Sequence, residues 1–312
     1  MNQSNRDLIN EKIGEGMKKV VLAGGTGFIG QYFQHGFEQL GYYVFIISRQ
    51  QGHISWQDHA GIVQALDGAD LLINLAGKSV NCRYNASNKK EIMESRTRTT
   101  RILGEAVLHC RKPPALWINA STATIYRHAE DKPMTEQSGE LGTGFSVEVA
   151  KAWEKAFFGY KLPHTRQAAL RIAIVLGPGG GVLTPYIYLT RFGLGGKQGP
   201  GNQKFSFIHV EDLFRMVQYI QSREDLEGVF NASAPYPVTN RELMHEMRKT
   251  MRVPVGIPTP KWMLEMGAIV IRTETELILK SRWVVPERLL EEGFEFKYPT
   301  IQTTLKSVLN IK

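Results

Sequence analysis

Residues 18–30 read Lys-Lys-Val-Val-Leu-Ala-Gly-Gly-Thr-Gly-Phe-Ile-Gly, a short apolar segment that runs into a glycine turn. Gly24, Gly27 and Gly30 give the spacing G-x-x-G-x-x-G. A helix-compatible segment follows at 31–40, and a second apolar strand is expected at 43–47. Such a turn lets backbone N–H groups and a helix N-terminus approach a pyrophosphate. The stretch therefore predicts the first β-α-β unit of a dinucleotide-binding fold.

The end of the second strand selects the cofactor. An Asp or Glu about twenty residues after the glycine turn is typical of NAD binding, because it accepts hydrogen bonds from the ribose 2′-hydroxyl. This chain has Ser48 and Arg49 instead. A guanidinium pairs with a 2′-phosphate that a carboxylate would repel. We therefore expect NADP(H), the alternative being that Arg49 is only a solvated charge at the end of a strand.

Composition narrows the class of protein. The 312 residues carry a net charge of +8, a mild surplus that suits an anionic cofactor or substrate. No basic run is interleaved with aromatic residues, so nucleic acid is not expected as a partner. Cys82 and Cys110 have no metal-ligand spacing and are expected to be reduced thiols in the cytoplasm, with no metal site. No segment is long and apolar enough for a membrane span, and the polar first residues lack the core of a signal peptide.

Apolar strands alternate with helical segments along the first half of the chain. Strands are expected at 69–75, 116–121, 168–176 and 205–210, and helices at 89–108 and 145–160. This rhythm predicts an α/β fold, a Rossmann doubly wound parallel sheet with a smaller C-terminal α+β lobe. The expected parts are an extension at 1–16 that is disordered or precedes a native start at Met17, a nucleotide-binding domain at 17–180 to which part of 202–225 returns, and a lobe at 181–312.

Several ordered motifs together resemble the NAD(P)-dependent epimerase/dehydratase family, the extended short-chain dehydrogenases/reductases. They are the glycine turn, Asn74-Leu75-Ala76-Gly77, the segment 121–126 (Ser-Thr-Ala-Thr-Ile-Tyr) and 208–213 (Ile-His-Val-Glu-Asp-Leu). Ser48-Arg49, Ser95-Arg96, Trp153-Glu154 and the block 286–296 are similar to one branch, the epimerase family proteins typified by bacterial YfhF and YfcH. The resemblance runs from about residue 17 to the end.

The resemblance implies further cofactor contacts. Cofactor contacts of Glu91 and Arg96, on the long helix, are implied by the resemblance alone. The alternative is that the two side chains form an ion pair on the surface of the helix. The resemblance also implies contacts at the Leu75–Ala76 backbone and near Val175. With the residues of the turn and of the second strand, the expected NADP(H) contacts are Gly24, Thr26, Gly27, Phe28, Ile29, Gly30, Ser48, Arg49, Leu75, Ala76, Gly77, Glu91, Arg96 and Val175.

The catalytic pattern is incomplete. In short-chain dehydrogenases a tyrosine transfers a proton, and a lysine four residues later lowers its pKa. Thr122 matches the Ser/Thr position that holds the substrate oxygen, and Lys151 matches the lysine, but Val147 stands where the tyrosine should be. Tyr126 is a candidate substitute acid, although the family uses this tyrosine in a structural turn. Lys151 either binds the nicotinamide ribose or is a solvated helix residue.

Two functions remain open at this point. The first is an NADP(H)-dependent oxidoreductase or epimerase that acts on a small anionic or sugar-nucleotide substrate, with an atypical active site. The second is a non-catalytic NADP(H)-binding redox sensor or regulator, similar to relatives labelled as cell-division-inhibitor-like. The resemblance also implies a homodimer.

Overall fold

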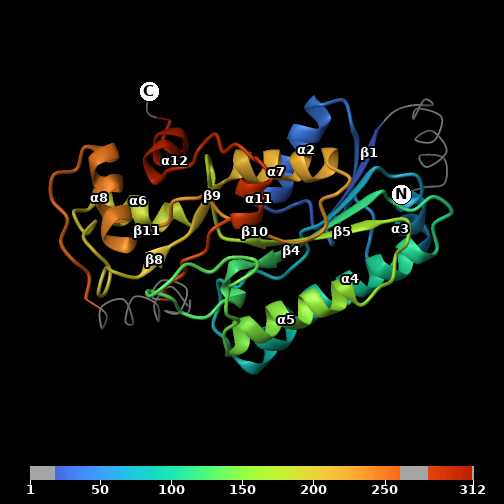
Figure 1. Cartoon of the computed structure of the whole chain (residues 1–312), viewed down its shortest axis with the longest axis horizontal. Helices are drawn as coiled ribbons and strands as arrows, with labels where there is room; N and C mark the ends of the chain where they lie inside the picture. Colours follow the sequence, from blue (N-terminus) through green and yellow to red (C-terminus); the bar gives the residue numbers. More distant parts are fainter. Residues whose placement is uncertain (1–17, 261–279, 311–312) are drawn as a thin grey trace.

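The computed structural model describes residues 18–260 and 280–310 (Figure 1). The predicted extension at 1–16 and the start at Met17 lie outside the described residues. No helix in the described part of the chain combines the length and apolarity needed to cross a membrane.

A six-stranded parallel sheet forms the centre of the molecule (Figure 1). Its strand order is β10-β5-β4-β3-β1-β2, and every neighbouring pair is parallel. The direction of winding reverses between β1 and β3, and this is the point where open α/β sheets bind ligands at the carboxyl ends of their strands. The strands are β1 (Lys19–Ala23), β2 (Tyr43–Ile47), β3 (Leu71–Asn74), β4 (Leu116–Thr122), β5 (Arg166–Ile172) and β10 (Gly228–Ala232).

Helices cover both faces of this sheet, as expected for strands that are apolar along their whole length. On one face α2 (Phe28–Gln39) and α7 (Val210–Ser222) pack through residues such as Phe37 and Phe214. On the other face lie α3 (His59–Leu66), α4 (Ala86–Leu108) and α5 (Phe145–Phe158), which pack through residues such as Leu103 and Phe157 (Figure 1). The predicted doubly wound α/β fold is confirmed.

A smaller lobe lies beside the carboxyl end of the sheet, at the left of Figure 1. A three-stranded sheet in the order β7-β6-β9 and a two-stranded pair, β8 with β11, lie among helices around a separate apolar core. The predicted α+β lobe is therefore present, while the boundary near residue 180 stays a prediction. The elements of the lobe are β6 (Ile174–Gly177), β7 (Gly180–Gly181), α6 (Leu183–Arg191), β8 (Lys204–Phe205), β9 (Phe207–His209), β11 (Val238–Thr239), α8 (Asn240–Met251) and α12 (Ile301–Val308). The short helix α11 (Glu287–Glu291) instead packs Leu289 into the core of the main sheet.

Two predicted strands are wrong in the same way. The expected strand at 168–176 is divided at Ala173, whose N–H donates to the Ala232 carbonyl at 2.9 Å, whereas β6 beyond it pairs with β9. The expected strand at 205–210 is divided at Ser206, whose hydroxyl donates to the Arg282 carbonyl at 2.7 Å. In both cases the chain leaves one sheet and enters another.

One buried carboxylate joins the C-terminal segment to the main domain. Asp212 is fully buried on α7 and accepts hydrogen bonds from the backbone N–H groups of Lys297 and Tyr298, both at 2.8 Å. His209, just before α7, stacks on the Tyr298 ring at 3.9 Å, and its Nε2 lies 3.2 Å from Ser307 Oγ on α12. The motif around His209 and Asp212 therefore positions the lobe.

Candidate functional site

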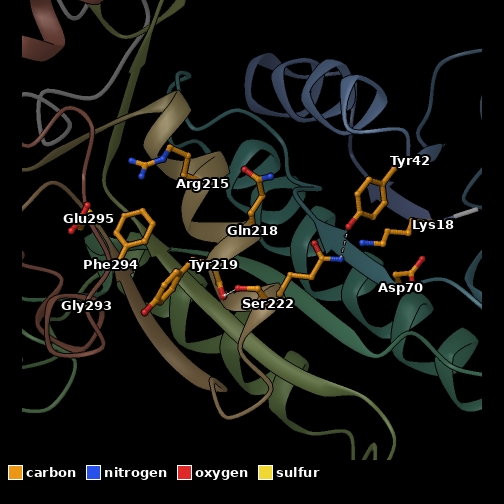
Figure 2. Close-up of a pocket in the computed structure, with 11 residues that line it drawn as sticks. Lys18, Tyr42, Asp70, Arg215, Gln218, Tyr219, Ser222, Gly293, Phe294 and Glu295 are labelled. Atoms are coloured by element: carbon orange, nitrogen blue, oxygen red, sulfur yellow. Dashed lines mark hydrogen bonds between the residues drawn. The ribbon is translucent and has the colours of Figure 1, made fainter.

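Two of the cavities lie at opposite edges of the main sheet. The larger, of about 720 Å³, lies at the amino ends of the strands, where Lys18, Tyr42 and Asp70 precede β1, β2 and β3 (Figure 2). The second, of about 510 Å³, lies at the carboxyl ends and includes the glycine turn. We place the candidate site in the second, because the reversal of winding and the free end of a helix coincide there.

The three glycines of the turn meet three different constraints. Gly24 has φ of 77°, and a Cβ on it would stand 2.7 Å from the backbone N and Cα of Ala76. A Cβ on Gly30 would stand 2.5 Å from Gly25 Cα, so this glycine lets the first turn of α2 pack on the loop. A Cβ on Gly27, by contrast, would meet nothing within 4 Å.

Gly27 is the N-cap of α2, is exposed, and provides no side-chain cap. The N–H groups of the first helical turn therefore face outward without side-chain partners, which is the arrangement that binds anions. The open space beside Gly27 is where a phosphate would approach the backbone. The turn fits the pyrophosphate of a dinucleotide.

The end of β2 carries a small charged cluster. Ser48 is buried, and its Oγ accepts from the Gln50 N–H at 3.0 Å, while Arg49 is exposed. On α4, Glu91 pairs with Lys78 at 2.6 Å. Lys78 is the main cause of the lowered pKa of Glu91, and the charge of Arg49 contributes to the same shift, so these groups lie near one another.

The loop after β3 is held by a buried side chain. Asn74 donates to Asn119 Oδ1 at 2.7 Å and to Thr100 Oγ1 at 3.0 Å, and its own Oδ1 accepts from the Ala76 N–H at 3.1 Å. These bonds fix the Leu75–Ala76 backbone beside Gly24. The sequence motif predicts small residues in the loop after β3. The structure shows that the Asn74 side chain orients the backbone of this loop.

Arg96 does not form a surface ion pair with Glu91. Burial lowers the pKa of Arg96 to about 10. Its Nη1 donates to the carbonyls of Lys78 and Ile92, both at 3.0 Å, and its guanidinium lies over the Trp153 ring at 5.1 Å. Among the described residues no carboxylate pairs with it, so a half-buried cation lines the cavity.

The structure brings many of the predicted site residues together around one cavity. The predicted residues that line it are Gly24, Gly27, Phe28, Ile29, Gly30, Leu75, Arg96, Thr122 and Val175. The others lie outside the lining, in the turn, at the end of β2, in the loop after β3, in the segment after β4, or on α4 and α5; they are Thr26, Ser48, Arg49, Ala76, Gly77, Glu91, Tyr126 and Lys151.

Tyr126 is buried away from the cavity lining. Its hydroxyl lies 2.9 Å from Asn231 Oδ1 and 3.0 Å from the Thr135 carbonyl, and it accepts from Arg171 Nη1 at 2.9 Å. Burial raises the pKa of Tyr126. These contacts favour the structural role of this tyrosine over proton transfer.

The position of the missing tyrosine is filled. Val147 is 1% exposed and belongs to an apolar cluster with Met134, Ala173 and Val284. Lys151, one turn later, is exposed and donates to the Gly142 carbonyl at 3.2 Å. The chain therefore departs from the family pattern both at position 147 and in the apolar side chains that pack around Val147.

Sequence reasoning missed five residues with side-chain hydroxyl groups that line the cavity: Ser79, Tyr84, Ser121, Thr124 and Ser146. Ser121 donates to Glu154 Oε1 at 2.6 Å, and Glu154 in turn accepts two bonds of 2.9 Å from Arg171. Ser146 could have been found from helix periodicity, because it shares a face with Val149 and Trp153.

Val147→Tyr is expected to lower the free energy of unfolding by about 2 kcal/mol, because the larger ring would overpack the cluster and bury a hydroxyl there. Urea denaturation measures the change. Val182→Tyr is the matched control, since Val182 is 46% exposed. An unchanged unfolding midpoint for Val147→Tyr would contradict the close packing described here.

Comparison with known proteins agrees with this geometry. The NAD dependent epimerase/dehydratase family matches residues 20–233, and a domain of unknown function, DUF1731, matches residues 259–308. The chain is 32% identical to mouse epimerase family protein SDR39U1 over 93% of this chain and 99% of that protein. It is 28% identical to epimerase family protein YfhF of Bacillus subtilis, over 93% of this chain and 97% of that protein.

A solved structure is similar throughout. The crystal structure of human SDR39U1 isoform 2 with NADPH has a TM-score of 0.85 and 29% identity, covering 94% of this chain and 100% of that one. The match of the family over most of the sheet, together with the relatives that cover nearly the whole chain, shows that this protein belongs to the NAD dependent epimerase/dehydratase family.

Proposed function

We propose that the protein is an NADP(H)-dependent oxidoreductase of the epimerase type, which acts on a small-molecule substrate. The observation that carries the proposal is the open space at Gly27, over the uncapped start of α2 and at the point where the sheet reverses its winding. The NADPH present in the similar human SDR39U1 structure supports the same cofactor. The homodimer stays a prediction.

The residues of this chain would bind the cofactor in three places. The turn from Gly24 to Gly30 would hold the pyrophosphate on backbone N–H groups. Ser48 and Arg49 would bind the 2′-phosphate, for which a guanidinium offers paired donors. The loop at 75–77, together with Glu91, Arg96 and Val175, would line the remainder of the site.

When bound, the nicotinamide group supplies or accepts a hydride. The chain contributes hydroxyl groups on Ser121, Thr122 and Thr124, which line the same cavity. The Thr122 Oγ1 atom accepts from the Thr124 N–H at 3.2 Å, and its own hydrogen can bond to a substrate oxygen. The apolar walls around these groups limit the access of water.

A second function is favoured by one set of observations. Val147 replaces the usual proton donor, and the Tyr126 hydroxyl is occupied by buried partners. A protein that binds NADP(H) without turnover, as a redox sensor or regulator, agrees with these features.

The variants Gly27→Ala and Gly24→Ala distinguish an effect on NADPH binding from an effect on the stability of the fold. At Gly27 the added methyl enters open space, so we expect the folded state to keep its stability and NADPH affinity to fall at least tenfold, because the methyl occupies the phosphate position. At Gly24 the methyl meets Ala76 at positive φ, so thermal stability falls as well. NADPH fluorescence titration and thermal unfolding report the two effects. Equal affinity in Gly27→Ala and the wild type would argue against a phosphate at the turn.

Arg49→Asp is expected to weaken NADPH binding about tenfold or more, since a charge-assisted hydrogen bond contributes about 1.5–3 kcal/mol. NADH binding should not weaken. Arg111→Asp makes the same charge change at an exposed position between α4 and β4, and is the control. If both variants bind NADPH equally well, the guanidinium of Arg49 does not read the 2′-phosphate.

Hydride transfer distinguishes the two functions. We expect deuterium from NADPH labelled at nicotinamide C4 to appear in a product when a panel of carbonyl compounds and nucleotide sugars is supplied. Mass spectrometry of the products measures the transfer. Tight NADPH binding with no labelled product from any compound would favour the sensor.

A further inference from the structure

Two threonine hydroxyls in the lining of the cavity accept hydrogen bonds and keep a hydrogen to donate. Thr122 Oγ1 accepts from the Thr124 N–H, and Thr124 Oγ1 accepts from Arg282 Nε, both at 3.2 Å. Both threonines are half-buried. Ser121, by contrast, gives its hydrogen to Glu154 at 2.6 Å. A hydroxyl that only accepts can still donate once, so a ligand oxygen can accept from either threonine.

Two cations contact Thr124 and make its hydroxyl the stronger donor of the two. The partner of Thr122 Oγ1 is a neutral backbone N–H, whereas the partner of Thr124 Oγ1 is the guanidinium of Arg282. The Thr124 carbonyl also accepts from Lys280 Nζ, at 3.0 Å. Bonds from a charged donor are roughly twice as strong as neutral ones, and each bond in a chain polarises the next. The hydrogen of Thr124 is therefore well suited to an oxygen that gains negative charge.

The backbone around Arg282 is held by both parts of the molecule. On the side of the lobe, the Arg282 N–H donates to the Lys204 carbonyl at 2.9 Å, and the Arg282 carbonyl accepts from the Ser206 hydroxyl at 2.7 Å. On the side of the main domain, the carbonyl of Trp283 accepts from the Met134 N–H at 2.6 Å. The Arg282 side chain is only 7% exposed. These bonds anchor the arginine independently of any ligand.

Two further hydroxyls line the cavity, on Ser79 and Tyr84 in the loop before α4. Ser79 Oγ accepts from the neutral N–H of Asn81 at 3.2 Å. The Tyr84 ring packs edge-on against the Phe145 ring, with the ring centres 5.1 Å apart. The bond from a cation favours Thr124 over Ser79, and Tyr84 is the rival donor that the experiment includes.

The site needs a donor of this kind because the usual tyrosine is absent. Val147 occupies its position, is 1% exposed and belongs to an apolar cluster. When a carbonyl group receives a hydride, negative charge develops on its oxygen. A fixed donor directed at that oxygen lowers the barrier to the reaction.

We propose that Thr124 donates the hydrogen bond that stabilises the substrate oxygen during hydride transfer, and that Arg282 positions and polarises the Thr124 hydroxyl. This inference rests on the proposed function. In the direction of reduction, a hydride from NADPH forms the new C–H bond, and the π pair of the C=O bond moves to the oxygen to which Thr124 donates. A water molecule supplies the proton that completes the alcohol, leaving NADP⁺ and hydroxide.

The proposal gives the C-terminal region a role at the site. Arg282 lies beyond residues 20–233, which match the epimerase/dehydratase family, and within residues 259–308, which match DUF1731. The positioning residue is therefore supplied by the domain of unknown function.

The experiment measures cofactor binding and oxyanion binding separately. Fluorescence titration with NADPH is carried out first on the wild type and on every variant, and it tests the proposed function. Protein saturated with NADP⁺ is then titrated with 4-nitrophenol across a pH series. The 4-nitrophenolate ion carries negative charge on an oxygen, as the developing alkoxide does, and its colour distinguishes it from the neutral phenol. The measured quantity is the affinity for the phenolate divided by the affinity for the phenol.

We expect the wild type to bind the phenolate more tightly than the phenol. Thr124→Val, which keeps the shape but removes the hydroxyl, should lower the affinity ratio about tenfold or more, the effect of one hydrogen bond to a charged group. Thr124→Ser should keep the ratio near that of the wild type because it keeps the hydroxyl. Arg282→Gln should lower the ratio, since the amide can still donate to Thr124 but carries no charge. NADPH affinity should stay unchanged in all three variants.

Two matched controls remove the same groups elsewhere. Thr99→Val removes a half-buried hydroxyl on α4 that donates to the Ser95 carbonyl at 2.7 Å. Arg166→Gln removes the charge of a half-buried arginine at the start of β5, which donates to the Leu226 carbonyl at 2.7 Å. Both controls should keep the affinity ratio of the wild type.

Three results would overturn the inference: no preference for the phenolate in NADP⁺-loaded wild type, the same affinity ratio in Thr124→Val as in the wild type, or loss of the preference in Tyr84→Phe instead. An unchanged ratio in folded Arg282→Gln would reject the role of Arg282, even if urea denaturation shows lower stability. Thr124→Val tests the inference even where Arg282→Gln does not fold, because valine keeps the shape of threonine. Failure of NADPH to bind the wild type would reject the proposed function at the first stage.

Discussion

The close approach of two backbones, at Gly24 after β1 and at Leu75–Ala76 after β3, is the constraint on which the candidate site depends. The two strands are neighbours in the sheet, but the chain winds away from them in opposite directions. A Cβ on Gly24 would stand 2.7 Å from Ala76 N, so the first glycine is required by the adjoining loop, independently of any ligand. Asn74 holds that loop in place through hydrogen bonds to Thr100 and Asn119. The glycine turn is thus built on the core of the sheet.

The sequence predicts the parts of this arrangement that depend on local pattern. Apolar strands, helical segments and a glycine turn with regular spacing were enough for the parallel sheet and for its ligand-binding edge. The division of residues 166–177 into β5 and β6 could not be predicted in the same way. Ile174 is apolar like its neighbours, and only its hydrogen bond to the Ser206 carbonyl, more than thirty residues away, shows that it has left the main sheet.

The candidate site likewise has one part that the local sequence pattern predicts and another that depends on contacts between residues far apart in the sequence. The positions of Arg49 and of the turn were predictable because their spacing is fixed by one β-α-β unit. Ser121 and Ser146 were not, because the difference between them depends on distant residues. The hydrogen of Ser121 is taken by Glu154, 33 residues later, whereas no described residue reaches the oxygen of Ser146. Tyr126 attracted a catalytic interpretation because it follows β4 closely, but its hydroxyl is occupied by Arg171 and Asn231, again far along the chain.

The buried pair of Glu154 and Arg171 connects these observations. Side chains that are only 12% and 10% exposed lose most of their hydration, so the attraction between them adds little net stability. The pair does fix orientation. Because Arg171 holds both oxygens of Glu154, the carboxylate keeps one direction, and Ser121 presents only its lone pairs to a ligand. Ser146 has no such partner among the described residues, and its oxygen is buried away from the accessible surface. Val147 is packed in the core, whereas Thr122 and Thr124 line the cavity and only accept hydrogen bonds at their hydroxyl oxygens, so both keep a hydrogen to donate. Both are neutral groups, which can orient an oxygen but have no charge of their own to offer.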